Sequence, residues 1–295
     1  MDQEKYKQHK VLVRHIVTSH HKMKGDFKVK FRSVDKILYD VTFKELGKGS
    51  YGRVVLITIK QARKHVGTIC VAEKEQKADI NFKREVELLW RMYKSKGLRL
   101  KPIIYDSFTI GNKGFIILPK MDGDLHNIGK ISDNDLISLL QQQVYTINYI
   151  HEKLKYRHCD AHNGNWMYFN TPLSKPFKIP GLSDFSVTKG KYTVFLYDPG
   201  MSSRTSRAKG ECVPASYDYY RIVSDHAGWS STQNLTKSQR ELVDGLRIVI
   251  LSMNGVVNYK QNDWDIKFKD SVQSDIVARS MLTTIELWKN KSNVF

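Results

Sequence analysis

The most informative sequence in this chain is His158-Cys159-Asp160-Ala161-His162-Asn163-Gly164-Asn165, which has the form H-x-D-x-x-x-x-N. Nineteen residues after Asn165 comes the pair Asp184-Phe185. Transfer of a phosphoryl group from a nucleotide needs one carboxylate to orient the attacking hydroxyl. It also needs an amide and a second carboxylate for the metal ions. Asp160, Asn165 and Asp184 would supply these three groups in that order, so the spacing predicts phosphoryl-transfer chemistry.

A second pattern, G-x-G-x-x-G-x-V, lies upstream at Gly47-Lys48-Gly49-Ser50-Tyr51-Gly52-Arg53-Val54. The flanking runs, residues 41–46 and 53–59, are rich in β-branched residues and are typical of strands. Glycines in a turn between two strands let the backbone approach phosphate groups closely. A dinucleotide-binding turn would be followed by a helix, and a P-loop would end in Gly-Lys-Ser or Gly-Lys-Thr. Both alternatives are therefore disfavoured.

Together these motifs resemble those of protein kinases, with Asp184-Phe185-Ser186 standing for the D-F-G triplet. The resemblance extends over roughly residues 41 to 225. It implies an α+β, two-lobed protein kinase fold with a small β-rich N-lobe and a mainly helical C-lobe. ATP and Mg²⁺ are the implied cofactors. Asp160 would then orient the substrate hydroxyl, while Asn165 and Asp184 would hold the metal ions.

The next strand and helix offer a lysine and an acidic partner. Val71-Ala72-Glu73-Lys74 fits the V-A-x-K pattern of the kinase strand whose lysine holds the phosphates, although a solvated lysine is the plain alternative. Residues 82–92 have apolar side chains at helical spacing. Glu85 matches the family pattern R-E-x-x-L-L, Glu87 is the runner-up, and both could equally be part of a charged helix face. The resemblance places these residues around the nucleotide: Gly47, Lys48, Gly49, Ser50, Gly52, Val54, Ala72, Lys74, Glu85, Pro119 and Met121.

Several departures from the family pattern bear on function. Cys159 replaces the arginine of H-R-D that normally pairs with an activation-loop phosphate, so constitutive activity is expected. His162 stands where small-molecule phosphotransferases of the aminoglycoside and choline type carry histidine. In contrast, the long segment between Asp184 and Asp218 favours a peptide substrate. Asp218 itself is either the helix carboxylate that braces the catalytic loop or an ordinary acid at the start of a helix.

The chain carries a strong positive charge. It has 48 Lys and Arg against 30 Asp and Glu, a net charge of +18 and a pI near 9.6. Such a field attracts nucleic acid or another polyanion, although a solvated basic surface explains it equally well. No apolar run of about eighteen residues and no signal-peptide core occur. Three cysteines make no disulfide framework, which fits a reducing, intracellular location.

We expect one kinase domain in three parts. These are a basic N-terminal extension at residues 1–36, an N-lobe at 37–121 and a C-lobe at 122–295. Within the extension, residues 11–17 are apolar enough to pack as a strand or a short helix. Helical patterns follow in the C-lobe at residues 132–150, 237–253 and 275–289.

The motifs predict a serine/threonine protein kinase that transfers the γ-phosphate of ATP to protein hydroxyls. The alternatives are a small-molecule kinase on the same fold and an inactive pseudokinase that binds a polyanionic partner. The H-x-D-x-H-x-x-N loop and the short C-lobe resemble divergent kinases encoded by large DNA viruses. That resemblance implies a location in the cytoplasm or nucleus of an infected cell, or packaging in the virion.

Overall fold

In the computed structural model the chain forms two compact units. The first comprises Met1–Tyr93 and Ile103–Met121, and the second comprises Lys94–Pro102 and Asp122–Phe295. The structure describes residues 3–33, 35–49, 52–61, 69–204, 214–228, 234–256, 268 and 272–292. The three-part division expected from the sequence stays a prediction. The structure assigns residues 94–102 to the second unit and the N-terminal segment to the first.

The first unit is built on an antiparallel sheet with the strand order β1-β2-β3-β4-β6-β5. Side chains alternate between the two faces of a strand, and β3 shows this with buried Val55, Ile57 and Ile59. Helix α2 (Ile80–Lys94) follows β4. The strands are β1 (Phe27–Arg32), β2 (Leu38–Gly49), β3 (Gly52–Gln61), β4 (Ile69–Lys77), β5 (Asp106–Ile110) and β6 (Lys113–Pro119).

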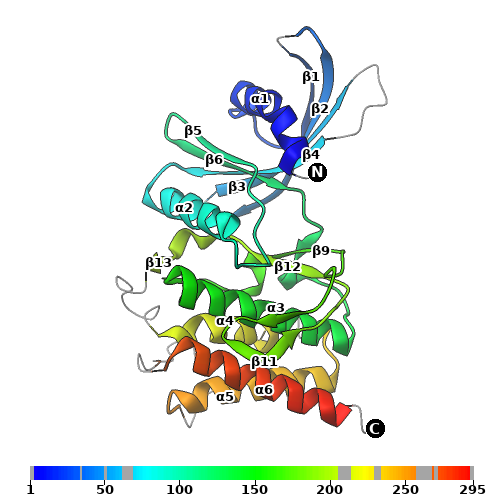
Figure 1. Cartoon of the computed structure of the whole chain (residues 1–295). Helices are drawn as coiled ribbons and strands as arrows, with labels where there is room; N and C mark the ends of the chain where they lie inside the picture. The colour runs from blue at the N-terminus through cyan, green and yellow to red at the C-terminus, as the bar shows by residue number, and fades with distance from the viewer. Residues whose placement is uncertain are drawn as a thin grey trace. The chain divides into compact units, whose positions relative to one another are not determined.

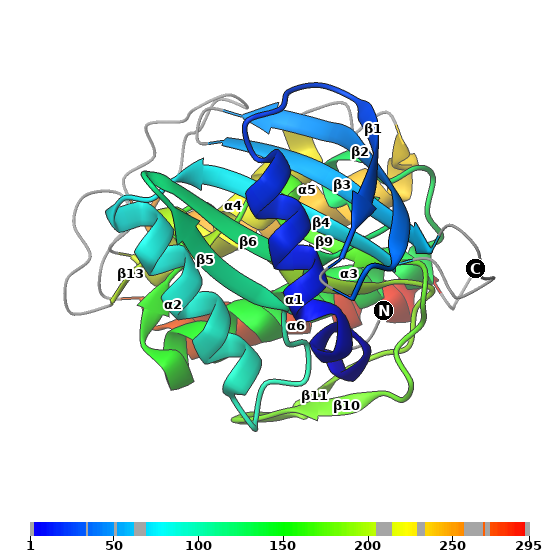
Figure 2. The ribbon, with the colours of Figure 1, turned by 90° about the horizontal axis from the view of Figure 1, so that it is seen from above.

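Helix α1 (Gln3–His20) lies across one face of this sheet, as Figure 2 shows. Arg14 Nη2 donates to Asp106 Oδ1 of β5 at 2.8 Å and ties the helix to the sheet. The apolar residues at 11–17 therefore belong to a helix of 18 residues, longer than the short element expected. The helix contributes three fully buried side chains to the core of the unit: Val13, Ile16 and Val17.

The second unit is mainly helical. Its long helices, drawn in Figure 1, are α3 (Asp133–Tyr149), α4 (Ala215–Gly228), α5 (Lys237–Met253) and α6 (Ser274–Ser292). Ser132 caps α3, because its Oγ accepts from Asp135 N at 3.2 Å. Thr236 and Gln239 form a capping box at the start of α5. The helices predicted from residues 132, 237 and 275 onward are confirmed to within a few residues.

The second unit also contains short strands, which connect to its loops and fix their positions. One sheet contains β7 (Gly123–Asp124), β9 (Trp166–Phe169) and β12 (Thr193–Leu196), with β9 in the middle. A separate hairpin pairs β10 (Phe177–Ile179) with β11 (Leu182–Val187). A third pair joins β8 (Tyr156–Arg157) to β13 (Ser203–Arg204).

The architecture confirms the predicted α+β fold class, with a β-rich N-terminal part and a mainly helical C-terminal part. Among the residues that the structure describes, no helix has the length and apolar character needed to cross a membrane.

Candidate active site

Lys74 of β4 pairs with Glu85 of α2 inside the first unit. Lys74 Nζ donates to Glu85 Oε1 at 2.8 Å and to Oε2 at 3.0 Å, and Gln76 Nε2 donates to Oε2 at 2.7 Å. Only 2% of Glu85 is exposed. The runner-up, Glu87, instead forms an ion pair with Arg91 on the helix surface at 2.9 Å. A buried carboxylate thus fixes the Lys74 ammonium in one position, ready for an anionic ligand.

The glycine-rich sequence joins β2 to β3, with Gly49 opposite Gly52. A Cβ atom on Gly47 would meet nothing within 4 Å, so the backbone there is open to an approaching group. A Cβ atom on Gly52 would lie 2.0 Å from the Glu75 carbonyl oxygen. Gly52 is therefore also required by the close approach of β4, a reason that the sequence does not reveal. Ser50, another predicted nucleotide contact, lies outside the described residues.

Val54 and Ala72 lie on the same face of the sheet as Lys74. Val54 is directly opposite Lys74 across the β3–β4 pair, and Ala72 precedes Lys74 by two residues on β4. Pro119 is the last residue of β6, and Met121 is the last residue of the first unit. Contact of these residues with a nucleotide stays a prediction.

In the second unit, a buried carboxylate holds the loop at residues 158–165. Asp218 Oδ2 accepts from His158 N at 2.8 Å, and Oδ1 accepts from Cys159 N at 2.8 Å. His151 Nε2 lies 2.8 Å from the same Oδ2. Burial alone would raise the pKa of Asp218, but these hydrogen bonds and the neighbouring histidines keep it below its ordinary value. Of the two interpretations of Asp218, the bracing carboxylate is confirmed.

The brace positions Asp160 beside Asn165. Asn165 Nδ2 donates to the Asp160 carbonyl oxygen at 2.8 Å and to Oδ2 at 3.3 Å. His162 Nε2 lies 3.6 Å from Oδ2, and Arg221 Nη2 of α4 lies 3.7 Å from Oδ1. Burial alone would raise the pKa of Asp160, but His162, His158 and Arg221 hold it below its ordinary value. Asp160 is therefore ionised at neutral pH and can accept a hydrogen bond from a hydroxyl group.

Asp184 does not share this environment. It lies on β11, which pairs with β10 rather than with β9, the strand that follows Asn165. Its side chain is 74% exposed and forms an ion pair with Arg279 Nη1 of α6 at 3.2 Å. The structure therefore does not bring the second predicted metal ligand together with the first.

A different carboxylate, Asp198, follows the strand that is paired with β9. Tyr197 N donates to the Asn165 carbonyl oxygen at 2.9 Å, and His158 Nε2 donates to the Tyr197 carbonyl oxygen at 3.1 Å. Asp198 comes next, in a left-handed conformation with φ 54° and ψ 52°. Sequence reasoning missed it because Pro199 stands where a phenylalanine was expected. The available signal was an apolar and aromatic run, residues 194–197, followed directly by Asp-x-Gly at residues 198–200.

The stretch between Asp184 and Asp218 is not one continuous loop. It includes β12, a helical turn at Pro199–Met201 and β13 before α4 begins at Ala215. If Asp198 marks the start of an activation segment, that segment is much shorter than the sequence suggested. A segment of that length favours a peptide substrate less than the one counted from Asp184 does.

Cys159 has a left-handed backbone, with φ 68°, and is disulfide-bonded. This bond departs from the expectation that the three cysteines make no disulfide framework. The side chains of the other two cysteines, Cys70 and Cys212, lie outside the part of the chain that the structure describes. Three cysteines far apart in the sequence form no pattern from which a bond could be predicted.

No protein-family model and no curated protein matches this chain. Among solved structures, the chain is similar to the BubR1 kinase domain, with 15% identity, a TM-score of 0.48, and coverage of 96% of this chain and 97% of that one. It is also similar to the PF14_0431 kinase domain, with 14% identity and a TM-score of 0.42. That match covers 72% of this chain and 63% of the other, so the chain spans less than two thirds of it. The function proposed below rests on the site geometry rather than on these two similarities.

Proposed function

We propose that this protein is a serine/threonine protein kinase that transfers the γ-phosphate of ATP to hydroxyl groups of protein substrates. The observation that carries the proposal is the loop at residues 158–165. Asp160 is ionised, 29% exposed and bonded to Asn165, on a backbone held by the buried Asp218. An ionised, partly exposed carboxylate on a firmly held loop is typical of a functional site.

The side chains of the site can support each step of the proposed phosphoryl transfer. The substrate hydroxyl would donate its hydrogen bond to Asp160, and its oxygen would bond to the γ-phosphorus as the bond to the leaving oxygen of ADP breaks. The proton would pass to Asp160 late in the reaction. Lys74, fixed by Glu85, would hold phosphate oxygens of the nucleotide. Charges that are already in position do not have to reorient when the transition state forms.

Asn165 and Asp198 fit the requirements of Mg²⁺, which prefers oxygen ligands. Because Asn165 directs its Nδ2 to the Asp160 carbonyl oxygen, its Oδ1 points away from that carbonyl and remains for a metal ion. Magnesium held there would neutralise charge on the phosphates. We assign the second ligand to Asp198 rather than Asp184, because Asp198 adjoins the residue that is bonded to Asn165.

The test is magnesium-dependent transfer of labelled phosphate from ATP to a mixture of serine, threonine and tyrosine peptides. Wild-type protein should label serine or threonine peptides. Asp160→Asn should lower the transfer rate by about a thousandfold or more while nucleotide affinity changes little. Equal rates for the two proteins would remove Asp160 from the proposal. Nucleotide binding without any transfer would instead support the pseudokinase alternative.

Two observations favour a small-molecule kinase as the second candidate. His162 lies 3.6 Å from Asp160, and the segment between Asp198 and α4 is short. The same assay with small alcohols, including an aminoglycoside and choline, separates the candidates. Labelling of a small alcohol at a higher kcat/KM than any peptide would favour the second one.

The basic charge suggests the partners and the location that complete the proposal. A net charge of +18 suits contact with nucleic acid or another polyanion. The resemblance to kinases of large DNA viruses suggests an infected cell, in its cytoplasm or nucleus, or the virion as the setting. Deletion of residues 3–20 is unsuitable as a test of polyanion binding, because α1 forms part of the core of the first unit.

A further inference from the structure

A charged cavity lies on the face of the first unit's sheet that is opposite to Lys74. Strand alternation places Arg53 and Glu75, which are cross-strand partners, on the face that α1 covers. That face also carries Val55 and Phe115, which pack with α1 in the core. Lys74 follows Glu73 and precedes Glu75 on β4, so its side chain points to the other face. The cavity therefore lies on the other face from Val54, Ala72 and Lys74. Among the predicted nucleotide contacts that the structure describes, only Lys48 and Gly52 of the glycine-rich hairpin also line it.

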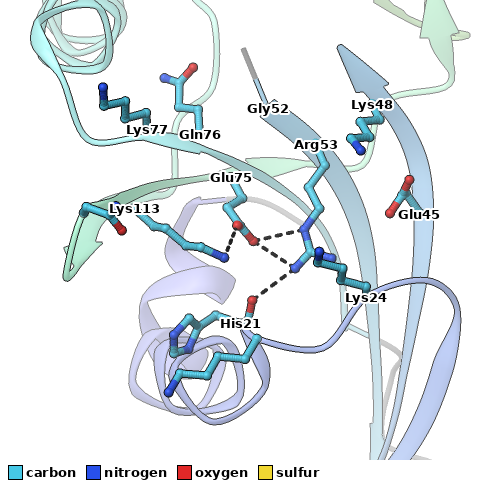
Figure 3. A pocket seen from close by; sticks show the side chains of 12 residues that line it. His21, Lys24, Glu45, Lys48, Gly52, Arg53, Glu75, Gln76, Lys77 and Lys113 are labelled. Carbon is cyan, nitrogen blue, oxygen red and sulfur yellow. Dashed lines mark hydrogen bonds and ion pairs between the residues drawn. The ribbon is translucent and has the colours of Figure 1, made fainter. Parts of the chain in front are cut away.

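Arg53 builds one wall of this cavity by joining the end of α1 to the sheet. Its Nη1 donates to the Met23 carbonyl oxygen at 2.9 Å, and its Nη2 donates to the His21 carbonyl oxygen at 3.2 Å. Its Nε and Nη2 also donate to Glu75 Oε2, at 3.0 and 2.8 Å. Lys113 Nζ reaches the other oxygen of Glu75 at 2.6 Å, as Figure 3 shows. These contacts hold the side chains of Arg53 and Glu75 in place without a ligand.

The cavity has a large excess of positive charge. Its volume is about 500 Å³, and it is lined by six cationic side chains and two acidic ones, Glu45 and Glu75. Glu75 is already shared by Arg53 and Lys113. Although burial alone would raise the pKa of Glu75, these two cations hold it below its ordinary value. The remaining cations have no ion-pair partner among the described residues: Lys22, Lys24, Lys48 and Lys77.

The types of cationic side chain that line the cavity indicate which kind of anion it would bind. The one arginine here is already engaged, because its Nε and Nη2 both donate to a single oxygen of Glu75, Oε2. The cations left over are all lysines, whose compact charges suit phosphate groups. Like charges gathered around one hollow repel each other, and a multiply charged anion relieves that repulsion. A hollow of this volume matches the size range of small-molecule sites.

We propose that this cavity is a binding site for a compact polyphosphate, that is, an anion carrying several phosphate groups close together. The cavity includes Lys48 and Gly52 of the glycine-rich hairpin. A bound polyphosphate would therefore also restrain that hairpin from the face opposite Lys74. The shared chemistry fits both a free inorganic polyphosphate and an organic phosphate ester.

Isothermal titration of the full chain, at physiological salt, tests the proposal with two probes. Inorganic tripolyphosphate and inositol hexakisphosphate represent the two sources, and the tighter probe identifies the source. Lys24→Gln combined with Lys48→Gln should weaken binding of the better probe by about tenfold. Both lysines are exposed, so the protein should fold normally, and circular dichroism verifies this.

The matched control removes the same charge from another hollow of the same sheet, which is lined by Lys30 and Lys60. Lys30→Gln combined with Lys60→Gln should leave the affinity unchanged, and Lys74→Met should also leave it unchanged. Equal weakening by both double variants would overturn the proposal in favour of diffuse attraction to a basic surface. Loss of binding in Lys74→Met would overturn it in favour of the nucleotide contacts. Equal affinity for citrate, or no binding of either probe, would also overturn it.

Discussion

The β9–β12 pair and the β10–β11 hairpin of the second unit each carry an aspartate, but in very different settings. Asp198 follows β12, whose neighbour β9 begins directly after Asn165, and Tyr197 N bonds to the Asn165 carbonyl oxygen at 2.9 Å. Asp184 lies within β11, exposes 74% of its side chain and pairs only at the surface with α6. Strand pairing, and not the adjacent aromatic residue, thus determines which carboxylate lies next to the loop at residues 158–165.

The largest expected difference is between Asp198→Asn and Asp184→Asn. A carboxylate that holds a metal ion against the phosphates stabilises charge in the transition state, so Asp198→Asn should lower kcat by about a thousandfold. Asp184→Asn removes only an exposed charge and should leave kcat within about twofold of wild type. The measurement is kcat for ATP-dependent transfer, at several magnesium concentrations.

Thermal unfolding of both variants shows whether a loss of activity is merely a loss of structure. If Asp184→Asn lowers kcat more than Asp198→Asn does, the metal ligand is Asp184, as the sequence predicted. Similar losses in both would mean that neither strand pair alone defines the metal site.

Asp218→Asn should have the next largest effect, on stability. Two backbone N–H groups now donate to the Asp218 carboxylate. In Asp218→Asn, the side-chain NH₂ group would face one of these two donors and could not accept its hydrogen bond. A buried donor left without an acceptor makes the free energy of unfolding smaller by about 2–3 kcal/mol. Because the pKa of Asp218 lies below its ordinary value in the folded protein, its contribution to stability is complete above that ordinary value. It is lost as pH falls through the folded-state pKa.

Urea unfolding of wild type and Asp218→Asn between pH 3 and pH 7 measures this effect. The difference in unfolding free energy should be full at neutral pH and should shrink toward acid pH. Asp184→Asn is the control, and it should change stability by less than about 0.5 kcal/mol at every pH. A difference that grows toward acid pH would contradict the lowered pKa of Asp218.

The sequence predicted those features whose residues all lie within one short stretch of the chain. The glycine turn between two strands, the amphipathic helix with Glu85 and the H-x-D-x-x-x-x-N loop are each contained in a short stretch. The structure pairs Lys74 with Glu85, which the family pattern favoured over Glu87, and it joins Asp160 to Asn165 of the same motif. The pattern-based fold class was confirmed for the same reason.

What sequence reasoning missed depended on contacts between distant parts of the chain. Asp184 lies in a strand and Asp198 follows one, and the pairing of β12 with β9 is what separates their surroundings. The position of Arg221 beside Asp160 depends on α4 lying next to the loop at residues 158–165, which residues far apart in the sequence do not reveal. The disulfide of Cys159 could not be predicted either, because sequence spacing does not tell which cysteines meet in space.

The two regions also differ in the arginine that lies beside their aspartate: Arg221 lies near Asp160, and Arg279 lies near Asp184. Arg221 is only 15% exposed and lies 3.7 Å from Asp160, which it helps to keep ionised. Arg221→Met should therefore lower kcat by about tenfold with little change in KM for ATP. Arg221→Lys should restore part of the loss, because it retains the charge. A variant with normal kcat would show that His162 and His158 hold Asp160 in its ionised state without help.

The smallest effect is expected from Arg279→Met, the corresponding change in the β10–β11 region. Arg279 and Asp184 are 51% and 74% exposed, and an exposed ion pair gains little attraction in water while two long side chains lose freedom. The unfolding free energy should fall by less than about 0.5 kcal/mol, with kcat unchanged. Urea unfolding in low and high salt checks this, because screening should remove even that difference. The double variant with Asp184→Asn should be no less stable than Arg279→Met alone. A loss above about 1 kcal/mol that persists in high salt would mean that this hairpin is anchored as firmly as the β9–β12 pair.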